Sequence, residues 1–176
     1  MINRRDFGKL VLGATALSFT ACNSLASGLS TIPANKKRVV IVGGGFGGAA
    51  TARYLRKFDS NVEIVLVEQN KEYYTCPFSN AVIAGMEKMD FIKHDLSTLA
   101  KKHNIKVVYA KVAKVDGASS SVILEYGEKI SYTKAVVSPG IDFKYEKGYT
   151  KENEKHSPHA VKAGEQTTIL QKQLEN

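Results

Sequence analysis

An apolar strand, a glycine-rich turn and an amphipathic segment follow one another early in the chain. Residues 38–42 are mostly β-branched, which is typical of a strand buried in a parallel sheet. The glycine-rich stretch 43–48 follows at once, and residues 49–58 then carry apolar or small side chains at helical spacing. A second apolar run, residues 62–67, ends at Glu68. This order predicts a strand, a tight turn, a helix and a second, parallel strand.

The later pattern predicts a smaller antiparallel unit and a return to the first sheet. We expect a short helix over residues 94–103 and a third strand over residues 106–109. Short alternating runs with turn residues between them predict an antiparallel meander, over residues 111–115, 121–125 and 129–132. Residues 135–137 predict a strand that leads into a Ser-Pro-Gly turn, and residues 164–174 predict a final helix.

The composition suits a globular α/β domain. The chain has 176 residues, of which 43% are hydrophobic and 24% are charged. It has only 2 cysteines, which excludes a scaffold held by many disulfides. The net charge of +8 comes from scattered lysines and arginines with no basic stripe interleaved with aromatic residues, so we do not expect nucleic-acid binding.

The first residues have the order of an export signal. Arg4 and Arg5 precede a mostly apolar run, residues 10–21, which is too short to span a hydrocarbon core of roughly 30 Å as a helix. The pattern is typical of a twin-arginine signal peptide and not of a membrane-spanning helix. It predicts a periplasmic protein without a stable membrane span.

Two processing sites are open at the end of this signal. The small residues Ser24 and Ala26 offer a cleavage site, which makes residues 1–26 the signal peptide and residues 27–37 a flexible linker. Alternatively, Cys22 is acylated and anchors a lipoprotein. Either choice leaves residues 38–176 as the nucleotide-binding domain.

The glycine-rich turn contains the spacing G-x-G-x-x-G between a strand and a helix. Gly43 permits the tight turn, Gly45 lets the backbone approach a pyrophosphate, and Gly48 lets the helix pack on the strand. The start of the helix offers free N–H groups to phosphates, and Glu68 can accept hydrogen bonds from ribose hydroxyls. The cofactor-binding residues predicted in this turn are Gly43, Gly45, Phe46, Gly47 and Gly48. The motif alone leaves FAD and NAD open.

The order of the later elements favours FAD. A nucleotide-binding sheet, a meander, and a strand that ends in a small-residue-Pro-Gly loop resemble the FAD-binding domain of the glutathione-reductase type. The resemblance implies a Rossmann-like α/β domain in which a parallel sheet carries an antiparallel meander. It also places Ser138, Pro139 and Gly140 at the cofactor.

Cys76 is the remaining candidate for chemistry. It has no disulfide partner in the chain once the signal is removed after residue 26. It could be a small buried hydrophobic residue or a reactive thiolate. An exposed thiol is a liability in an oxidising compartment, and burial or a covalent bond would remove it.

Several motifs resemble the flavoprotein subunit of flavocytochrome c sulfide dehydrogenase. They are residues 39–45, residues 73–76 with Ser79 and Asn80, residues 136–141 and residues 158–167. This resemblance implies that Cys76 forms a thioether to the 8α-methyl group of FAD. The chain departs from the family at Val161, where a tryptophan is expected, and at Pro77.

The resemblance also implies a function. Family members oxidise sulfide and pass electrons through FAD to a separate c-type cytochrome subunit. This chain has no C-x-x-C-H haem motif, no cysteine pair that could form a sulfide-reactive disulfide, and no second dinucleotide motif. We therefore expect it to be an N-terminal part that lacks the second dinucleotide domain and the C-terminal domain, contains no catalytic residue, and is inactive alone.

Two alternatives stay open, and no metal site is expected. The chain could be a truncated FAD-binding module without turnover, or a relative of sulfide:quinone reductases or NADH dehydrogenases. The histidines are too few for a metal site. We expect His94 and His103 on the solvated face of a helix, and His156 and His159 in a loop.

Overall fold

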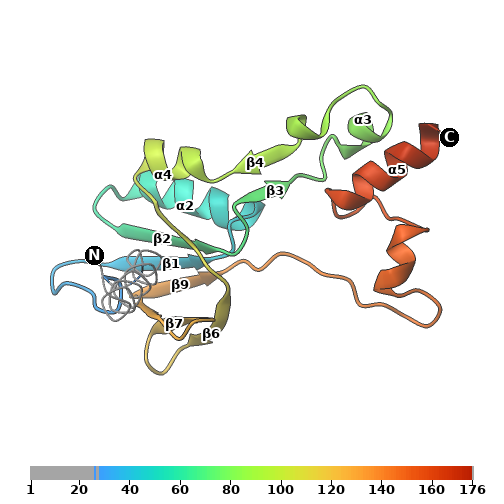
Figure 1. Ribbon diagram of the computed structural model, residues 1–176. Coiled ribbons are helices and arrows are strands. Elements are labelled where there is room, and N and C mark those ends of the chain that lie inside the picture. The colour runs from blue at the N-terminus through green and yellow to red at the C-terminus, as the bar shows by residue number, and fades with distance from the viewer. Residues whose placement is uncertain (1–25, 27, 176) are drawn as a thin grey trace, which may run out of the picture.

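A four-stranded parallel sheet forms the centre of the computed structural model, which describes residue 26 and residues 28–175 (Figure 1). Its strand order is β5-β2-β1-β9. The strands are β1 (Arg38–Val42), β2 (Glu63–Glu68), β5 (Lys106–Tyr109) and β9 (Lys134–Val137). All three pairings are parallel, as predicted. The predicted signal peptide and Cys22 lie outside the described residues.

Helices α2 (Phe46–Phe58) and α4 (Ser97–His103) cover one face of this sheet (Figure 1). Successive side chains of a strand point to opposite faces, and Val39 and Ile41 of β1 pack on the helical side. The buried side chains of this layer are Val39, Ile41, Ala52, Val62, Ile64, Leu66, Leu96 and Ile105. The helix predicted after the glycine turn therefore packs on the strands that flank it in sequence.

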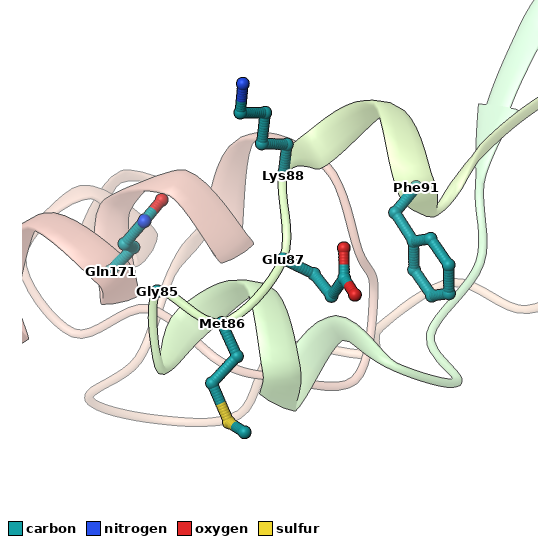
Figure 2. A pocket seen from close by; sticks show the side chains of 6 residues that line it. All are labelled: Gly85, Met86, Glu87, Lys88, Phe91 and Gln171. Atoms are coloured by element: carbon teal, nitrogen blue, oxygen red, sulfur yellow. The ribbon is translucent and has the colours of Figure 1, made fainter.

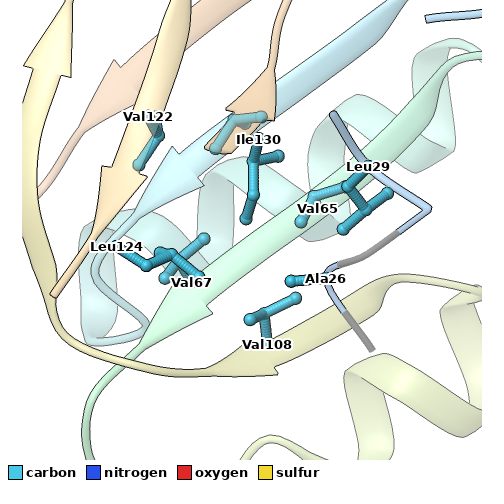
Figure 3. Packing of buried hydrophobic residues seen from close by; sticks show 9 residues of the cluster. Ala26, Leu29, Val65, Val67, Val108, Val122, Leu124 and Ile130 are labelled. Atoms are coloured by element: carbon cyan, nitrogen blue, oxygen red, sulfur yellow. The ribbon is translucent and has the colours of Figure 1, made fainter. Parts of the chain in front are cut away.

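An antiparallel meander covers the other face, as predicted. It consists of β6 (Val112–Asp116), β7 (Ser121–Leu124) and β8 (Lys129–Ser131). Figure 3 shows Val122, Leu124 and Ile130 of the meander against the side chains of the parallel sheet. The strand residues on this side are Val40, Val65, Val67 and Val108, which alternate with those of the helical face.

A smaller group of elements lies beside the sheet. The ribbon of β3 (Glu72–Tyr74) and β4 (Lys93–Asp95) is antiparallel and leads to α3 (Ser79–Ile83) and η1 (Met89–Phe91). The chain from β9 then runs through η2 (Lys151–Lys155) to α5 (Glu165–Glu175). Figure 1 shows α5 beside α3, so the end of the described chain packs on the segment that follows Cys76.

The predicted helix over residues 94–103 is wrong at its start. His94 belongs to β4 and pairs with Tyr73 of β3, and the helix begins only at Ser97. The carboxylate of Asp95 accepts hydrogen bonds from the Ser97 hydroxyl at 2.7 Å and the Ser97 N–H at 2.9 Å, so the chain turns between strand and helix. These hydrogen bonds, that of the hydroxyl first, lower the pKa of Asp95.

The predicted linker over residues 27–37 is in part a structural element. Leu29 is only 1% exposed and packs with Ala26, Val65 and Val108 (Figure 3). Its carbonyl accepts a hydrogen bond from Nη1 of Arg38 at 2.6 Å. The Arg38 side chain is buried and also forms an ion pair with Glu63 at 2.8 Å. One apolar residue and one buried arginine thus fasten the start of the linker to the sheet.

We predict that Leu29→Ala lowers the free energy of unfolding by about 3 kcal/mol, because it leaves a cavity in the core between sheet and meander. Urea denaturation followed by circular dichroism measures the change. Leu174→Ala is the control, since Leu174 is 69% exposed, and it should change stability by less than about 0.5 kcal/mol. Equal effects of the two substitutions would contradict the packing of Leu29.

Candidate functional site

Backbone segments approach one another closely at the glycine turn. Gly43 has a φ of +96°, and a Cβ on it would lie 2.0 Å from the carbonyl oxygen of Ser138. A Cβ on Gly48 would lie 1.8 Å from the carbonyl oxygen of Gly43. The main chain of Ser138 also donates a hydrogen bond to Val42 O at 2.8 Å. Only glycines allow β1, α2 and the end of β9 to meet in this way.

Gly45 lies at the open side of the same turn. It precedes the first residue of α2 with an ordinary φ of −68°, and a Cβ on it would meet no atom within 4 Å. The space beside Gly45 is therefore available to a ligand. The first N–H groups of α2 have no carbonyl partner within the helix, and they make this space suitable for a phosphate group.

Glu68 ends β2 beside the glycine turn. Its carboxylate accepts hydrogen bonds from the N–H of Gly44 at 2.6 Å and from the N–H of Asn70 at 2.9 Å. These two bonds fix the direction of the carboxylate. Since each carboxylate oxygen can accept more than one hydrogen bond, Glu68 can still bind the hydroxyls of a ribose.

A cavity of about 450 Å³ lies at the carboxyl ends of the parallel strands, which is where open α/β sheets bind their ligands. Six predicted site residues line it, namely Gly43, Gly45, Glu68, Ser138, Pro139 and Gly140. The other two predicted glycines serve packing, because a Cβ on Gly47 would lie 2.6 Å from Oγ of Ser138 and Gly48 adjoins Gly43. Phe46 is 62% exposed and is not part of the lining.

Five polar residues of the lining were not predicted. They are Gln69, Asn70, Tyr73, Lys111 and Lys162. Lys111 pairs with Glu125 at 3.0 Å and Lys162 with Asp142 at 3.4 Å, and neither carboxylate is part of the lining. Burial, and then the charge of Asp95, raise the pKa of Tyr73. Lys162 is brought here by the long loop after β9, and no local pattern in the sequence indicates that.

Cys76 lies at the start of the segment between β3 and α3. Its thiol is exposed and lies 3.6 Å from the carbonyl oxygen of Ala160, which contradicts the alternative of a buried cysteine. Cys76 does not line the cavity. Two lining residues are close to this contact in sequence, namely Tyr73 before Cys76 and Lys162 after Ala160. Cys76 is thus three residues from one lining residue, and its contact partner Ala160 is two residues from another.

A second depression is lined by the turn that follows α3, by η1 and by α5 (Figure 2). It measures about 610 Å³, and no predicted site residue lines it. Figure 2 shows the charged side chains of Glu87 and Lys88 pointing in different directions, so these polar groups do not converge on one point. Residues 28–175 also contain no group of three His, Cys, Asp or Glu side chains that could hold a metal ion. The glycine-turn cavity is therefore the candidate site.

Comparison with known proteins agrees with this choice of site. The family model for pyridine nucleotide-disulphide oxidoreductases matches residues 37–175. The flavoprotein chain of sulfide dehydrogenase (flavocytochrome c) from Chlorobaculum thiosulfatiphilum is 65% identical over 46 residues, which are 26% of this chain and 96% of that sequence. This identity confirms the resemblance that the motifs indicate.

Sulfide-quinone reductase of Aquifex aeolicus is another relative. Its sequence is 32% identical over 104 residues, which are 59% of this chain. The solved structure of the sulfide:quinone oxidoreductase from this bacterium has a TM-score of 0.66 at 28% identity and covers 79% of this chain. This chain spans 24% of the length of that sequence and 32% of that structure. The match confirms the predicted fold.

We predict opposite outcomes for two alanine substitutions in the turn. Gly48→Ala should lower the free energy of unfolding by about 2 kcal/mol, because its Cβ meets the Gly43 carbonyl. Gly45→Ala should change it by less than about 0.5 kcal/mol, because its Cβ meets open space. Thermal or urea unfolding of the flavin-free proteins measures both. A destabilised Gly45→Ala protein would show that this side of the turn is closed.

Proposed function

This chain belongs to the pyridine nucleotide-disulphide oxidoreductase family, and we propose that it is the FAD-binding part of a sulfide-oxidising flavoprotein. The observation that carries the proposal is the cavity formed by the glycine turn, Glu68 and the Ser138–Gly140 loop at the carboxyl ends of the sheet. Membership of the family implies FAD. The similarity to a sulfide dehydrogenase and a sulfide:quinone reductase supports sulfide as the electron donor.

The residues of the cavity fit FAD. The open space at Gly45 and the N–H groups at the start of α2 would hold the pyrophosphate. Glu68, oriented by Gly44 and Asn70, would hold the ribose. Lys162, which pairs with Asp142 at 3.4 Å, belongs to the same lining. When bound, FAD supplies the chemistry that accepts an electron pair from a donor and passes the electrons on.

We further propose that Cys76 attaches FAD covalently, through a thioether to the 8α-methyl group. The exposed thiol of Cys76, three residues after Tyr73 of the cavity lining, and the similarity to the flavocytochrome c flavoprotein support this role. The new bond joins Sγ to the 8α carbon. The thiol hydrogen and one methyl hydrogen leave as protons, and the electron pair goes through the flavin to the electron acceptor of the protein.

The backbone around Cys76 is well fixed for such a role. Thr75 is buried, and its N–H donates a hydrogen bond to Ile92 O at 2.9 Å. The N–H of Ser79 donates to the carbonyl of Cys76 at 3.0 Å. These hydrogen bonds hold the main chain at residues 75–79, so the position of the thiol is set by rotation of the Cys76 side chain.

A c-type cytochrome subunit in the periplasm is the proposed electron acceptor. The flavocytochrome c similarity supports it, and the twin-arginine pattern supports an exported protein that acquires FAD before export. No helix among the described residues is long and apolar enough to cross a membrane. A quinone is the second candidate acceptor, favoured by the sequence and structural similarity to the Aquifex reductase.

We predict that unfolded wild-type protein keeps its flavin, whereas Cys76→Ser releases all of it. Denaturation, ultrafiltration and intact mass measure the covalent fraction. Cys22→Ser is the matched control, because Cys22 is the other cysteine of the chain, and it should keep the covalent flavin. Complete release from the wild-type protein, or covalent flavin in Cys76→Ser, would rule out the thioether.

The acceptor can be identified on the whole protein isolated with any bound subunit. We predict that sulfide reduces a c-type cytochrome faster than it reduces a soluble quinone analogue. Stopped-flow absorption follows both reactions with the same enzyme preparation. Faster quinone reduction would favour the second candidate, and no sulfide-dependent reduction of either would contradict the proposed function.

A further inference from the structure

A polar cluster orders the long loop between β9 and α5. Its centre is Glu154 of η2, whose side chain is only 15% exposed. One carboxylate oxygen accepts a hydrogen bond from the Tyr145 hydroxyl and lies 3.5 Å from Nε2 of His159. The other accepts a hydrogen bond from Nε2 of Gln166 at 3.2 Å. Through Glu154 the cluster therefore joins η2 to three other places: the start of the loop at Tyr145, the final part of the loop at His159, and α5 at Gln166.

Gln166 extends this cluster to the main chain. Its Oε1 accepts a hydrogen bond from the N–H of His159 at 3.2 Å, while its Nε2 binds Glu154. The His159 ring packs on Phe143 with 4.3 Å between ring centroids. The main chain at His159 is thus held by Gln166 of α5. The His159 ring is held by Phe143 and Glu154, which precede it in the loop.

The next residue along the chain contacts Cys76. The carbonyl oxygen of Ala160 lies 3.6 Å from Sγ of Cys76, across 84 positions of sequence. Between β9 and α5 the only regular element is η2. The main-chain ladder of a strand or helix therefore cannot hold Ala160 in place, and the nearest interactions that can are those of the cluster at His159.

We propose that Glu154, Gln166 and His159 are positioning residues, which hold the carbonyl of Ala160 against the Cys76 thiol and thereby orient it for bonding to the flavin. The inference rests on the proposed attachment of FAD at Cys76. Bond formation between two held groups depends steeply on their orientation, and a misplacement of about 1 Å can slow it by about a hundredfold. A carbonyl acceptor restricts the rotation of a thiol that is otherwise exposed.

The electrostatics of the cluster agree with Glu154 as its common acceptor. The hydrogen bond to Glu154 is the main reason why the pKa of Tyr145 is raised to about 12. Lys162 pairs with Asp142 at 3.4 Å and not with Glu154. The contacts of the Glu154 carboxylate are with Tyr145, Gln166 and His159.

The test compares Gln166→Met with Gln171→Met in the full chain. Gln166→Met removes the two hydrogen bonds that Gln166 forms with His159 and Glu154, and it keeps the length of the side chain. Gln171→Met changes the same helix at the depression of Figure 2, outside the cluster. Glu154→Ala, with the exposed Glu152→Ala as its control, is a second pair that leaves α5 unchanged.

Two quantities are measured on each protein. Amide hydrogen exchange of residues 156–164 in the flavin-free protein reports the order of the loop. The covalent share of the bound flavin, with total bound flavin measured separately, reports the orientation of the thiol. We expect loop exchange to rise about tenfold in Gln166→Met and Glu154→Ala, as for a lost hydrogen bond, and the covalent share to fall severalfold at unchanged total flavin. Both controls should match the wild type.

Unchanged loop exchange in both variants would overturn the proposal. Faster exchange with an unchanged covalent share would also overturn it, as would an equal loss of covalent and total flavin, because either shows a merely structural role. A wild-type protein that never forms the thioether overturns the attachment itself and the positioning role with it. That failure is recognisable because it is the same in wild type and in every variant.

Discussion

The close approach of backbone segments around Gly43 sets the geometry of the sheet and the site. The N–H of Gly43 donates to Val67 O of β2 at 2.8 Å, and the N–H of Ser138, after β9, donates to Val42 O of β1 at 2.8 Å. The Gly43 carbonyl lies where a side chain on Gly48 would begin. Because no Cβ separates these segments, the ends of three strands and the start of α2 share one small volume. The cavity is what remains open beside that volume at Gly45.

Most of the fold follows from local patterns in the sequence. Short apolar runs with the helix between them predict parallel strands, because both faces of such a sheet are covered. In the structure, alternate residues of β1 pack on the helices and on the meander, which explains why the whole run is apolar. The errors lie where a distant partner decides. His94 joins a strand because β3 is there to pair with it, and Leu29 is buried because Arg38 and the meander hold its segment.

The site also has a part that local sequence patterns predict and a part that depends on distant residues. The glycines and Glu68 are predictable because their functions depend on residues within one β-α-β unit. The exposure of Cys76, its contact with Ala160 and the presence of Lys162 in the cavity lining all depend on a loop that returns from far along the chain. The pattern of hydrophobic residues does not predict that this loop returns to Cys76. Family motifs in that loop mark it as important, but only the structure gives its contacts.

The glycine turn and the Cys76 thiol would hold the cofactor by different means. The phosphate end of the cavity is built from strand ends and a helix start, so its geometry is as stable as the sheet core. The thiol end depends on side-chain hydrogen bonds in a loop whose cluster is partly exposed to solvent. Affinity for the dinucleotide and orientation of the thiol therefore rest on separate parts of the molecule. A change in the loop can disturb the covalent bond while the glycine turn still binds the phosphates.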